Sequence, residues 1–198
     1  MLTLILDTAY NLKVAIIDND KVVADLIFEE KRADRYMQII DNSLKKCGYA
    51  IEQVNNIAVN IGPGSFTGLR VAVSVVKGLA FGKNIDIYTF TSFDFCDALK
   101  KENIILPAFS DFVYVKYSDG AMDCVKTDEL KEKAFVTNFD EIISTQNLCG
   151  IYIKKVKTKD PIEVFKGAKK VEKLTDIRPV YLRKSQAEIA LEEKKKKI

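Results

Sequence analysis

Short apolar runs separated by turn residues open the chain. LTLILD (2–7), KVAIID (13–18) and KVVADLIF (21–28) have the length and composition of β-strands. Asn19 and Asp20, between the second and third runs, are a tight-turn signal. The pattern therefore predicts three successive antiparallel strands.

The apolar period then changes from that of a strand to that of a helix. Over residues 33–47 the apolar side chains recur at three- and four-residue steps: Tyr36, Met37, Ile40, Leu44 and Cys47. Strand-type runs at 56–61 and 85–90 flank a second predicted helix, from about Gly68 to Gly82, and a short third helix is expected over 92–101. The predicted order of this first lobe is β-β-β-α-β-α-β.

A second set of strand-type runs follows a boundary near residue 101. The runs lie at 105–110, 112–118, 121–127, 149–155 and 179–185. Asp119 and Gly120 are a hairpin signal within this set, and Ser185 with Glu188 has capping-box spacing for a final polar helix. The sequence therefore predicts two lobes, residues 1–101 and residues 102–198.

The predicted helix over 68–82 is apolar on nearly all sides. Only Arg70, Ser74 and Lys77 interrupt its apolar residues. One side can lie on the sheet, but such a helix needs a second cover on its other side. That second side contains Val71, Ser74, Val75 and Gly78. The cover is the 33–47 helix, a second copy of the chain or another protein, and the pattern alone leaves all three open.

A glycine-rich loop precedes this helix. It reads Gly62, Pro63, Gly64, Ser65, Phe66, Thr67, Gly68, and Arg70 follows in the first helical turn. Ser65 or Thr67 can cap the helix, whose free N–H groups could bind an anion. However, no lysine follows Gly68, so the spacing is not that of a phosphate-binding P-loop, nor is it G-x-G-x-x-G. We favour close packing over phosphate binding as the role of this loop.

Composition excludes several classes of chemistry. The chain contains no histidine, which removes the commonest general base, the histidine-based nucleophile relays and nearly all zinc and iron sites. The four cysteines lack metal-type spacing and are expected to be reduced thiols. We therefore expect no metal and no cofactor.

No apolar run reaches the roughly 18 residues of a membrane span, and signal-peptide features are lacking. We therefore expect a cytoplasmic protein without a membrane partner.

Charge is distributed unevenly along the chain. Residues 154–198 contain 15 Lys and Arg against 7 Asp and Glu, a net charge of +8, whereas the whole chain is +3, so residues 1–153 carry −5. A basic end indicates either an anionic partner or a solvated, lysine-rich surface. We favour the solvated surface on charge alone.

Three stretches together resemble one known family. The chain is similar to the TsaB (YeaZ) family in LILDTAY near the start, VNIGPGSFTGLRVAVSVVKGLAFG (59–82) in the middle and RPVYLRKSQAEIA near the end. This family has the actin-like/Hsp70/sugar-kinase (ASKHA, ribonuclease H-like) fold and takes part in the synthesis of tRNA threonylcarbamoyladenosine. The resemblance implies an α/β fold of two lobes, with mixed central sheets flanked by helices.

The resemblance also implies a non-catalytic role. Family members bind and activate a larger paralogue, TsaD, which transfers the threonylcarbamoyl group to an adenosine next to the tRNA anticodon. A TsaE-type ATPase and tRNA contact the family protein only indirectly, through the complex. The family protein alone forms homodimers. The implied interface lies on the first two helices, at Tyr36, Met37, Ile40, Leu44, Val71, Ser74, Val75 and Gly78.

The alternative function is an autonomous enzyme, either an actin-fold ATPase or a glycoprotease-like (M22 type) hydrolase. Asp7 and Thr8 follow the first strand, where actin-fold ATPases bind metal and phosphate, so they mark a possible vestigial nucleotide site. Asp7 could instead bind N–H groups of its own turn.

The candidates to approach tRNA phosphates are Arg183, Lys184 and Lys194 to Lys197. Many family members have a His-Ser pair where this chain has Asp34 and Arg35.

Overall fold

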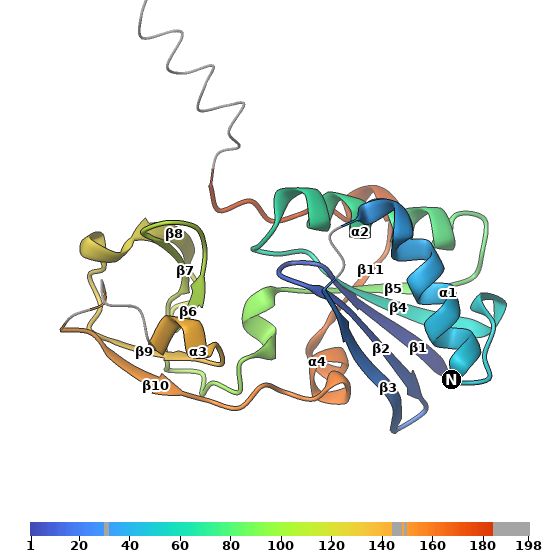
Figure 1. Cartoon of the computed structure of the whole chain (residues 1–198), viewed down its shortest axis with the longest axis horizontal. Helices are drawn as coiled ribbons and strands as arrows, with labels where there is room; N and C mark the ends of the chain where they lie inside the picture. The colour runs from blue at the N-terminus through green and yellow to red at the C-terminus, as the bar shows by residue number, and fades with distance from the viewer. Residues whose placement is uncertain (30–31, 144–147, 149, 184–198) are drawn as a thin grey trace, which may run out of the picture. The chain divides into compact units, whose positions relative to one another are not determined.

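The computed structural model describes residues 1–29, 32–143, 148 and 150–183, which fold into two compact units (Figure 1). The first unit consists of Met1–Phe95 and Lys159–Val180. The second consists of Cys96–Thr158 and, among the described residues that follow Val180, residues 181–183. The predicted boundary near residue 101 lies close to the change of unit after Phe95. However, the prediction assigned residues 159–180 to the second lobe, and the structure returns them to the first.

A six-stranded mixed sheet forms the centre of the first unit. Its strands are β1 (Leu2–Asp7), β2 (Leu12–Asp18), β3 (Lys21–Phe28), β4 (Val54–Asn60), β5 (Asp86–Phe90) and β11 (Lys169–Val171). Their order across the sheet is β11-β5-β4-β1-β2-β3. The first three strands are antiparallel neighbours, as predicted, while β4 runs parallel to both β1 and β5.

Helices cover both faces of this sheet because its central strands are apolar on both sides. On one face, Leu4, Val14 and Ile57 belong to a core cluster with residues of α1 (Tyr36–Lys46) and α2 (Phe66–Ala80). On the other face, Ile5 and Ala58 form a second cluster with Val164 of α4. Helix α4 (Pro161–Gly167) begins with Asp160 as its N-cap, and the Asp160 side chain accepts a hydrogen bond from the Glu163 N–H at 2.9 Å.

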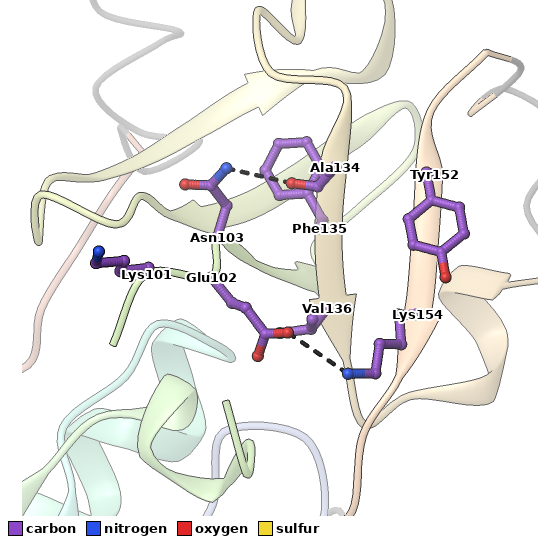
Figure 2. Close-up of a pocket in the computed structure, with 8 residues that line it drawn as sticks. All are labelled: Lys101, Glu102, Asn103, Ala134, Phe135, Val136, Tyr152 and Lys154. Carbon is purple, nitrogen blue, oxygen red and sulfur yellow. Dashed lines mark hydrogen bonds and ion pairs between the residues drawn. The ribbon is translucent and has the colours of Figure 1, made fainter. Parts of the chain in front are cut away.

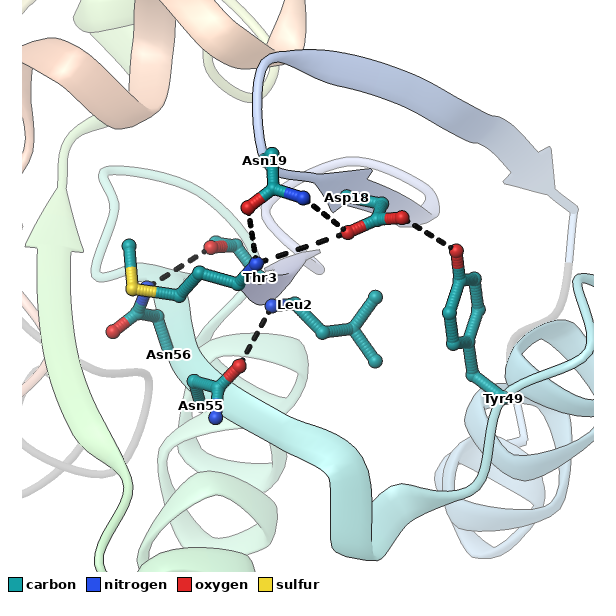
Figure 3. A network of polar contacts seen from close by, with 8 residues as sticks. Leu2, Thr3, Asp18, Asn19, Tyr49, Asn55 and Asn56 are labelled. Atoms are coloured by element: carbon teal, nitrogen blue, oxygen red, sulfur yellow. Dashed lines mark hydrogen bonds and ion pairs between the residues drawn. The ribbon is translucent and has the colours of Figure 1, made fainter.

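Polar side chains fix the strand register where β1 begins (Figure 3). The Leu2 N–H donates to Asn55 Oδ1 at 2.7 Å, and Asn56 Nδ2 donates to the buried Thr3 hydroxyl at 3.1 Å. Tyr49, which follows α1, donates its hydroxyl to Asp18 Oδ2 at 2.9 Å. These bonds tie β1 to β4, and β2 to the segment after α1, at one end of the sheet. The opposite end holds the glycine loop.

The second unit contains a five-stranded mixed sheet. Its strands are β6 (Ile104–Pro107), β7 (Phe112–Lys116), β8 (Met122–Lys126), β9 (Ala134–Thr137) and β10 (Tyr152–Lys155), in the order β10-β9-β6-β7-β8. Strands β6, β7 and β8 form the predicted antiparallel meander. Short helix α3 (Asp140–Ile143) inserts Ile142 into the apolar core on one face of this sheet.

Several predicted elements are shorter in the structure or lie outside its described part. The helix expected over 92–101 is a single 3₁₀ turn, Ser92–Phe95, and residues 179–183 contain no strand. The final helix after Ser185 lies outside the described residues. Other 3₁₀ turns are Ala33–Arg35, Ile51–Gln53, Thr127–Glu129 and Leu174–Asp176.

The described cysteines are free thiols, with Cys96 buried and both Cys47 and Cys124 half-buried, while Cys149 lies outside the described residues. In the described ranges, every helix is too short or too polar to cross a membrane.

Candidate functional site

Helix α2 begins at Phe66, two residues before the predicted start near Gly68, and is capped by the first of the two predicted cap residues, Ser65 and Thr67. Ser65 is its N-cap, and the Ser65 hydroxyl accepts a hydrogen bond from the Gly68 N–H at 3.2 Å. The Ser65 N–H in turn donates to the Ala9 carbonyl at 2.8 Å. The first turn of α2 is therefore attached to the turn that follows β1.

Close approach of backbone explains two glycines of the loop. A Cβ at Gly64 would lie 2.6 Å from the Ala9 carbonyl oxygen, and one at Gly68 would lie 2.3 Å from the Thr8 carbonyl oxygen. Neither position has room for a side chain. Pro63, preceded by a cis peptide bond, is buried in the same loop. This geometry favours close packing as the role of the loop.

Asn60 at the end of β4 connects the loop to two neighbouring strands. Its amide Nδ2 donates to Asp7 Oδ1 at 2.8 Å and to the Ser92 hydroxyl at 3.0 Å, while its Oδ1 accepts from the Gly62 N–H at 2.8 Å. The Ser92 hydroxyl donates to the Pro63 carbonyl at 2.6 Å. The ends of β1 and β4 and the segment after β5 are thus bonded together at the loop that leads into α2.

Asp7 sits in this network with an unfavourable charge. Burial raises the pKa of its carboxyl to about 6, although hydrogen bonds from the Ala9 N–H and Asn60 and the charge of Lys13 partly oppose that rise. Its Oδ1 accepts from the Ala9 N–H at 2.8 Å. Asp7 therefore binds an N–H group of its own turn. This binding is the predicted alternative to a nucleotide site. The hydroxyl oxygen of buried Thr8 has no hydrogen-bond partner in the described part of the chain.

Predicted contact residues of α1 fall into two groups in the structure. Tyr36, Ile40 and Leu44 are buried in the core beneath the helix, with exposed fractions of 6%, 0% and 0%. Met37 is 42% exposed. The structure therefore assigns the first three residues to the core of their own unit, and of these four residues only Met37 remains accessible to a partner.

Helix α2 presents an accessible side that we call the outer stripe. It consists of exposed Arg70, Ser74 and Gly78, and half-buried Val71 and Val75. The Ser74 hydroxyl is turned back onto the Arg70 carbonyl, at 2.8 Å. A Cβ built on Gly78 has no atom within 4 Å. This side of α2 is small, weakly polar and open.

The motif loop contributes its remaining side chains at the start of the outer stripe. Thr67 is exposed and Phe66 half-buried, and the Arg70 guanidinium lies over the Phe66 ring, 5.8 Å from its centroid. At the other end, Phe81 directly follows α2 and is 81% exposed. The sequence prediction did not place Phe81 on this side of the helix. Its three-residue step from Gly78 is the signal that it continues the outer stripe.

A metal-binding cluster is lacking among the described residues of this surface. Within the described ranges, no three His, Cys, Asp or Glu side chains lie together as metal ligands would.

In the second unit, the Arg183 guanidinium lies 4.0 Å from the centroid of the Phe109 ring. The other basic residues considered for tRNA contact, Lys184 and Lys194 to Lys197, lie outside the described residues.

Comparison with known proteins gives consistent matches. The family described as TsaD: tRNA N6-adenosine threonylcarbamoyltransferase matches residues 27–99. The tRNA threonylcarbamoyladenosine biosynthesis protein TsaB of Bacillus subtilis is 30% identical over 140 residues, covering 65% of this chain and 61% of that protein. The protein of the same name from Escherichia coli is 31% identical over 88 residues, covering 43% of this chain and 38% of that protein. The chain therefore matches about three fifths or less of the length of these relatives.

Solved structures share the fold across nearly the whole chain. YeaZ from Pseudomonas aeruginosa superimposes with a TM-score of 0.68 at 18% identity, covering 91% of this chain and 99% of that chain. A protein with similarity to peptidase YEAZ, also from Pseudomonas aeruginosa, gives a TM-score of 0.67 at 19% identity, covering 92% of this chain and 99% of that chain. These likenesses show the actin-like fold of two mixed sheets flanked by helices.

Proposed function

The sequence and fold matches support the assignment of this chain to the TsaB (YeaZ) family, and on that premise we propose that it is a non-catalytic subunit of a tRNA-modifying complex. In this proposal the chain binds and activates a TsaD-type paralogue. That paralogue transfers the threonylcarbamoyl group to the adenosine next to the tRNA anticodon. A TsaE-type ATPase and tRNA meet the chain through the complex rather than independently.

The observation that carries this proposal is the outer stripe of α2. Gly78 leaves open space beside half-buried Val71 and Val75, so another helix can approach the α2 backbone closely. Exposed Phe81 and Met37 add apolar area that water does not favour. A surface of small residues next to exposed large apolar side chains suits a protein partner better than a small-molecule ligand.

The chemistry of the chain supports a non-catalytic role over the autonomous enzyme. No histidine is present to act as a base or to hold a metal. Asp7, which an actin-fold ATPase would direct at a metal-bound nucleotide, gives its Oδ1 to two intramolecular hydrogen bonds.

The proposal is tested by reconstitution with purified proteins. We expect the chain and the TsaD-type protein of the same organism to elute as one complex in size-exclusion chromatography with light scattering. Omission of the chain should abolish threonylcarbamoyladenosine formation on tRNA. The chain alone should form a homodimer through the outer stripe and should give no heat on titration with Mg-ATP. The absence of a complex at about 10 µM of each protein would contradict the proposal.

A further inference from the structure

The second unit contains a pocket between the segment before β6 and strands β9 and β10 (Figure 2). Its volume is about 160 Å³, and it is lined by residues 101–103 before β6, residues 134–136 of β9, and Tyr152 and Lys154 of β10. Strands β6 and β9 share a single register pair, Ile104 with Val136, and the Asn103 carbonyl before β6 accepts from the Val136 N–H at 2.8 Å. Asn103 holds one wall in position, since its Nδ2 donates to the Ala134 carbonyl at 3.2 Å and its Oδ1 accepts from the Ser118 N–H at 2.9 Å.

Strand β10, the edge of the sheet, supplies an aromatic ring and a cation to this pocket. Tyr152 and Lys154 lie on the same face of β10, because side chains alternate along a strand. Ile153, between them, points the other way and packs against the apolar core. Tyr152 as a residue is 68% exposed, which is unusual for a tyrosine on a sheet.

The charged groups of the pocket have an excess of one positive charge. Lys154 Nζ lies 3.6 Å from Glu102 Oε1, with the lysine side chain 55% exposed, so this ion pair is long and solvated. Lys101 lines the same pocket and makes no ion pair with the described residues. The Lys101 side chain extends away from Tyr152, so the ammonium group that an anion beside the tyrosine would meet is that of Lys154 (Figure 2).

We propose that this pocket binds one nucleotide of single-stranded RNA, with its base stacked on Tyr152 and its phosphate next to Lys154. Aromatic rings beside cations are the usual means of binding single-stranded nucleic acid without a deep cavity. Lysines on an edge strand also prevent pairing with another sheet, but that role does not account for an exposed tyrosine beside a pocket. The choice of RNA rests on the proposed function, in which the complex acts on tRNA.

Fluorescence anisotropy with a labelled anticodon stem–loop RNA, at low salt and with the full chain, tests this proposal. Tyr152→Ala should weaken binding by about 5- to 150-fold, the effect of losing one base stack. Tyr152→Phe keeps the ring and should bind within about 2-fold of the unmodified chain. Lys154→Ala should lower the slope of log affinity against log salt by about 0.7, because one phosphate contact is lost.

Two further variants separate the pocket from general charge effects. Glu102→Gln removes the carboxylate that competes for Lys154 and should tighten RNA binding, whereas the matched tyrosine control Tyr181→Ala should leave it unchanged. Equal affinity of Tyr152→Ala and the unmodified chain would overturn the proposal, as would binding of free AMP without binding of RNA.

The failure of this inference is distinguishable from failure of the proposed function. Tyr152→Ala should still form the complex with the TsaD-type protein, because Tyr152 belongs to the second unit and the outer stripe to the first. A chain that forms the complex but binds no RNA would contradict only the nucleotide pocket. A chain that binds RNA through Tyr152 but forms no complex would contradict only the proposed function.

Discussion

Asn60 donates its side-chain amide to Asp7 Oδ1 across the parallel strands β4 and β1, at 2.8 Å. The same amide reaches the Ser92 hydroxyl, and Asn60 Oδ1 accepts from the Gly62 N–H. One side chain therefore links the ends of two strands to the glycine loop. Since α2 starts from that loop, the direction of the outer stripe depends on this network.

Replacing Asp7 by asparagine should stabilise the protein at neutral pH. The folded pKa of about 6 lies above the ordinary value of 3.8, so Asp7 stabilises the fold most below pH 3.8, and that contribution is lost as pH rises through 6. Asparagine is never charged, and its Oδ1 can still accept from Ala9 and Asn60. We expect Asp7→Asn to raise the free energy of unfolding by about 1–3 kcal/mol at pH 7.5.

Urea denaturation at pH 7.5 and at pH 4.0 measures this effect. The gain from Asp7→Asn should shrink at pH 4.0, where much of the native Asp7 is already protonated. A variant that is less stable than the unmodified chain at pH 7.5 would show that the carboxylate is needed in its charged form.

Removal of the Asn60 side chain should destabilise the first unit. Asn60→Ala leaves the Gly62 N–H and the Ser92 hydroxyl without one partner each, in a buried position. We expect a loss of about 2–4 kcal/mol in the free energy of unfolding, because unsatisfied buried groups retain their desolvation cost. The control is Asn42→Ala, an exposed asparagine on α1, which should change stability by less than about 0.5 kcal/mol.

The sequence predicted Asp7 as a site residue but missed Asn60 and Ser92. Both were detectable, since Asn60 ends the apolar run of β4 and Ser92 follows β5, and parallel strands bring such ends to one edge of the sheet. What could not be predicted was the bonding between them, because it depends on the path of the loop at Gly62 and Pro63.

Periodicity predicted α1 and α2 of the first unit correctly, but it missed α4 and misled the choice of contact residues on α1. Tyr36, Ile40 and Leu44 form the only long apolar stripe of that helix, and such a stripe is the side that packs on the sheet. Helix α2 has apolar residues on two sides, so periodicity indicated a second surface there. The outer stripe is where that surface lies.

The return of residues 159–180 to the first sheet had no sequence signal. Strand β11 is only three residues long and reads Lys169, Lys170, Val171, which has no strand-type apolar pattern. It is held by pairing with β5, and Lys170 forms an ion pair with Asp86 at 2.7 Å. Such a short polar edge strand is determined by tertiary contacts rather than by its own composition.

Glycines of the same helix should respond oppositely to alanine. Gly78→Ala should stabilise α2 by about 0.5–1 kcal/mol, because the added methyl group meets open space and alanine is the better helix former. Gly68→Ala should destabilise the protein by more than about 2 kcal/mol, since its Cβ would overlap the Thr8 carbonyl. Thermal unfolding followed by circular dichroism measures both, and equal effects would contradict the packing role of the loop.

A large charged residue at Gly78 should abolish partner binding while leaving the chain folded. Gly78→Arg fills the gap beside Val71 and Val75, so a helix can no longer approach α2 closely. Gly167→Arg is the matched control, because Gly167 is also a helical glycine with open space around its Cβ but belongs to α4 on the other face of the sheet. Isothermal titration against the TsaD-type protein should show affinity reduced at least about 100-fold by Gly78→Arg and unchanged by Gly167→Arg. If both variants bind as tightly as the unmodified chain, the partner does not lie on the outer stripe, and α2 owes its second apolar side to some other requirement.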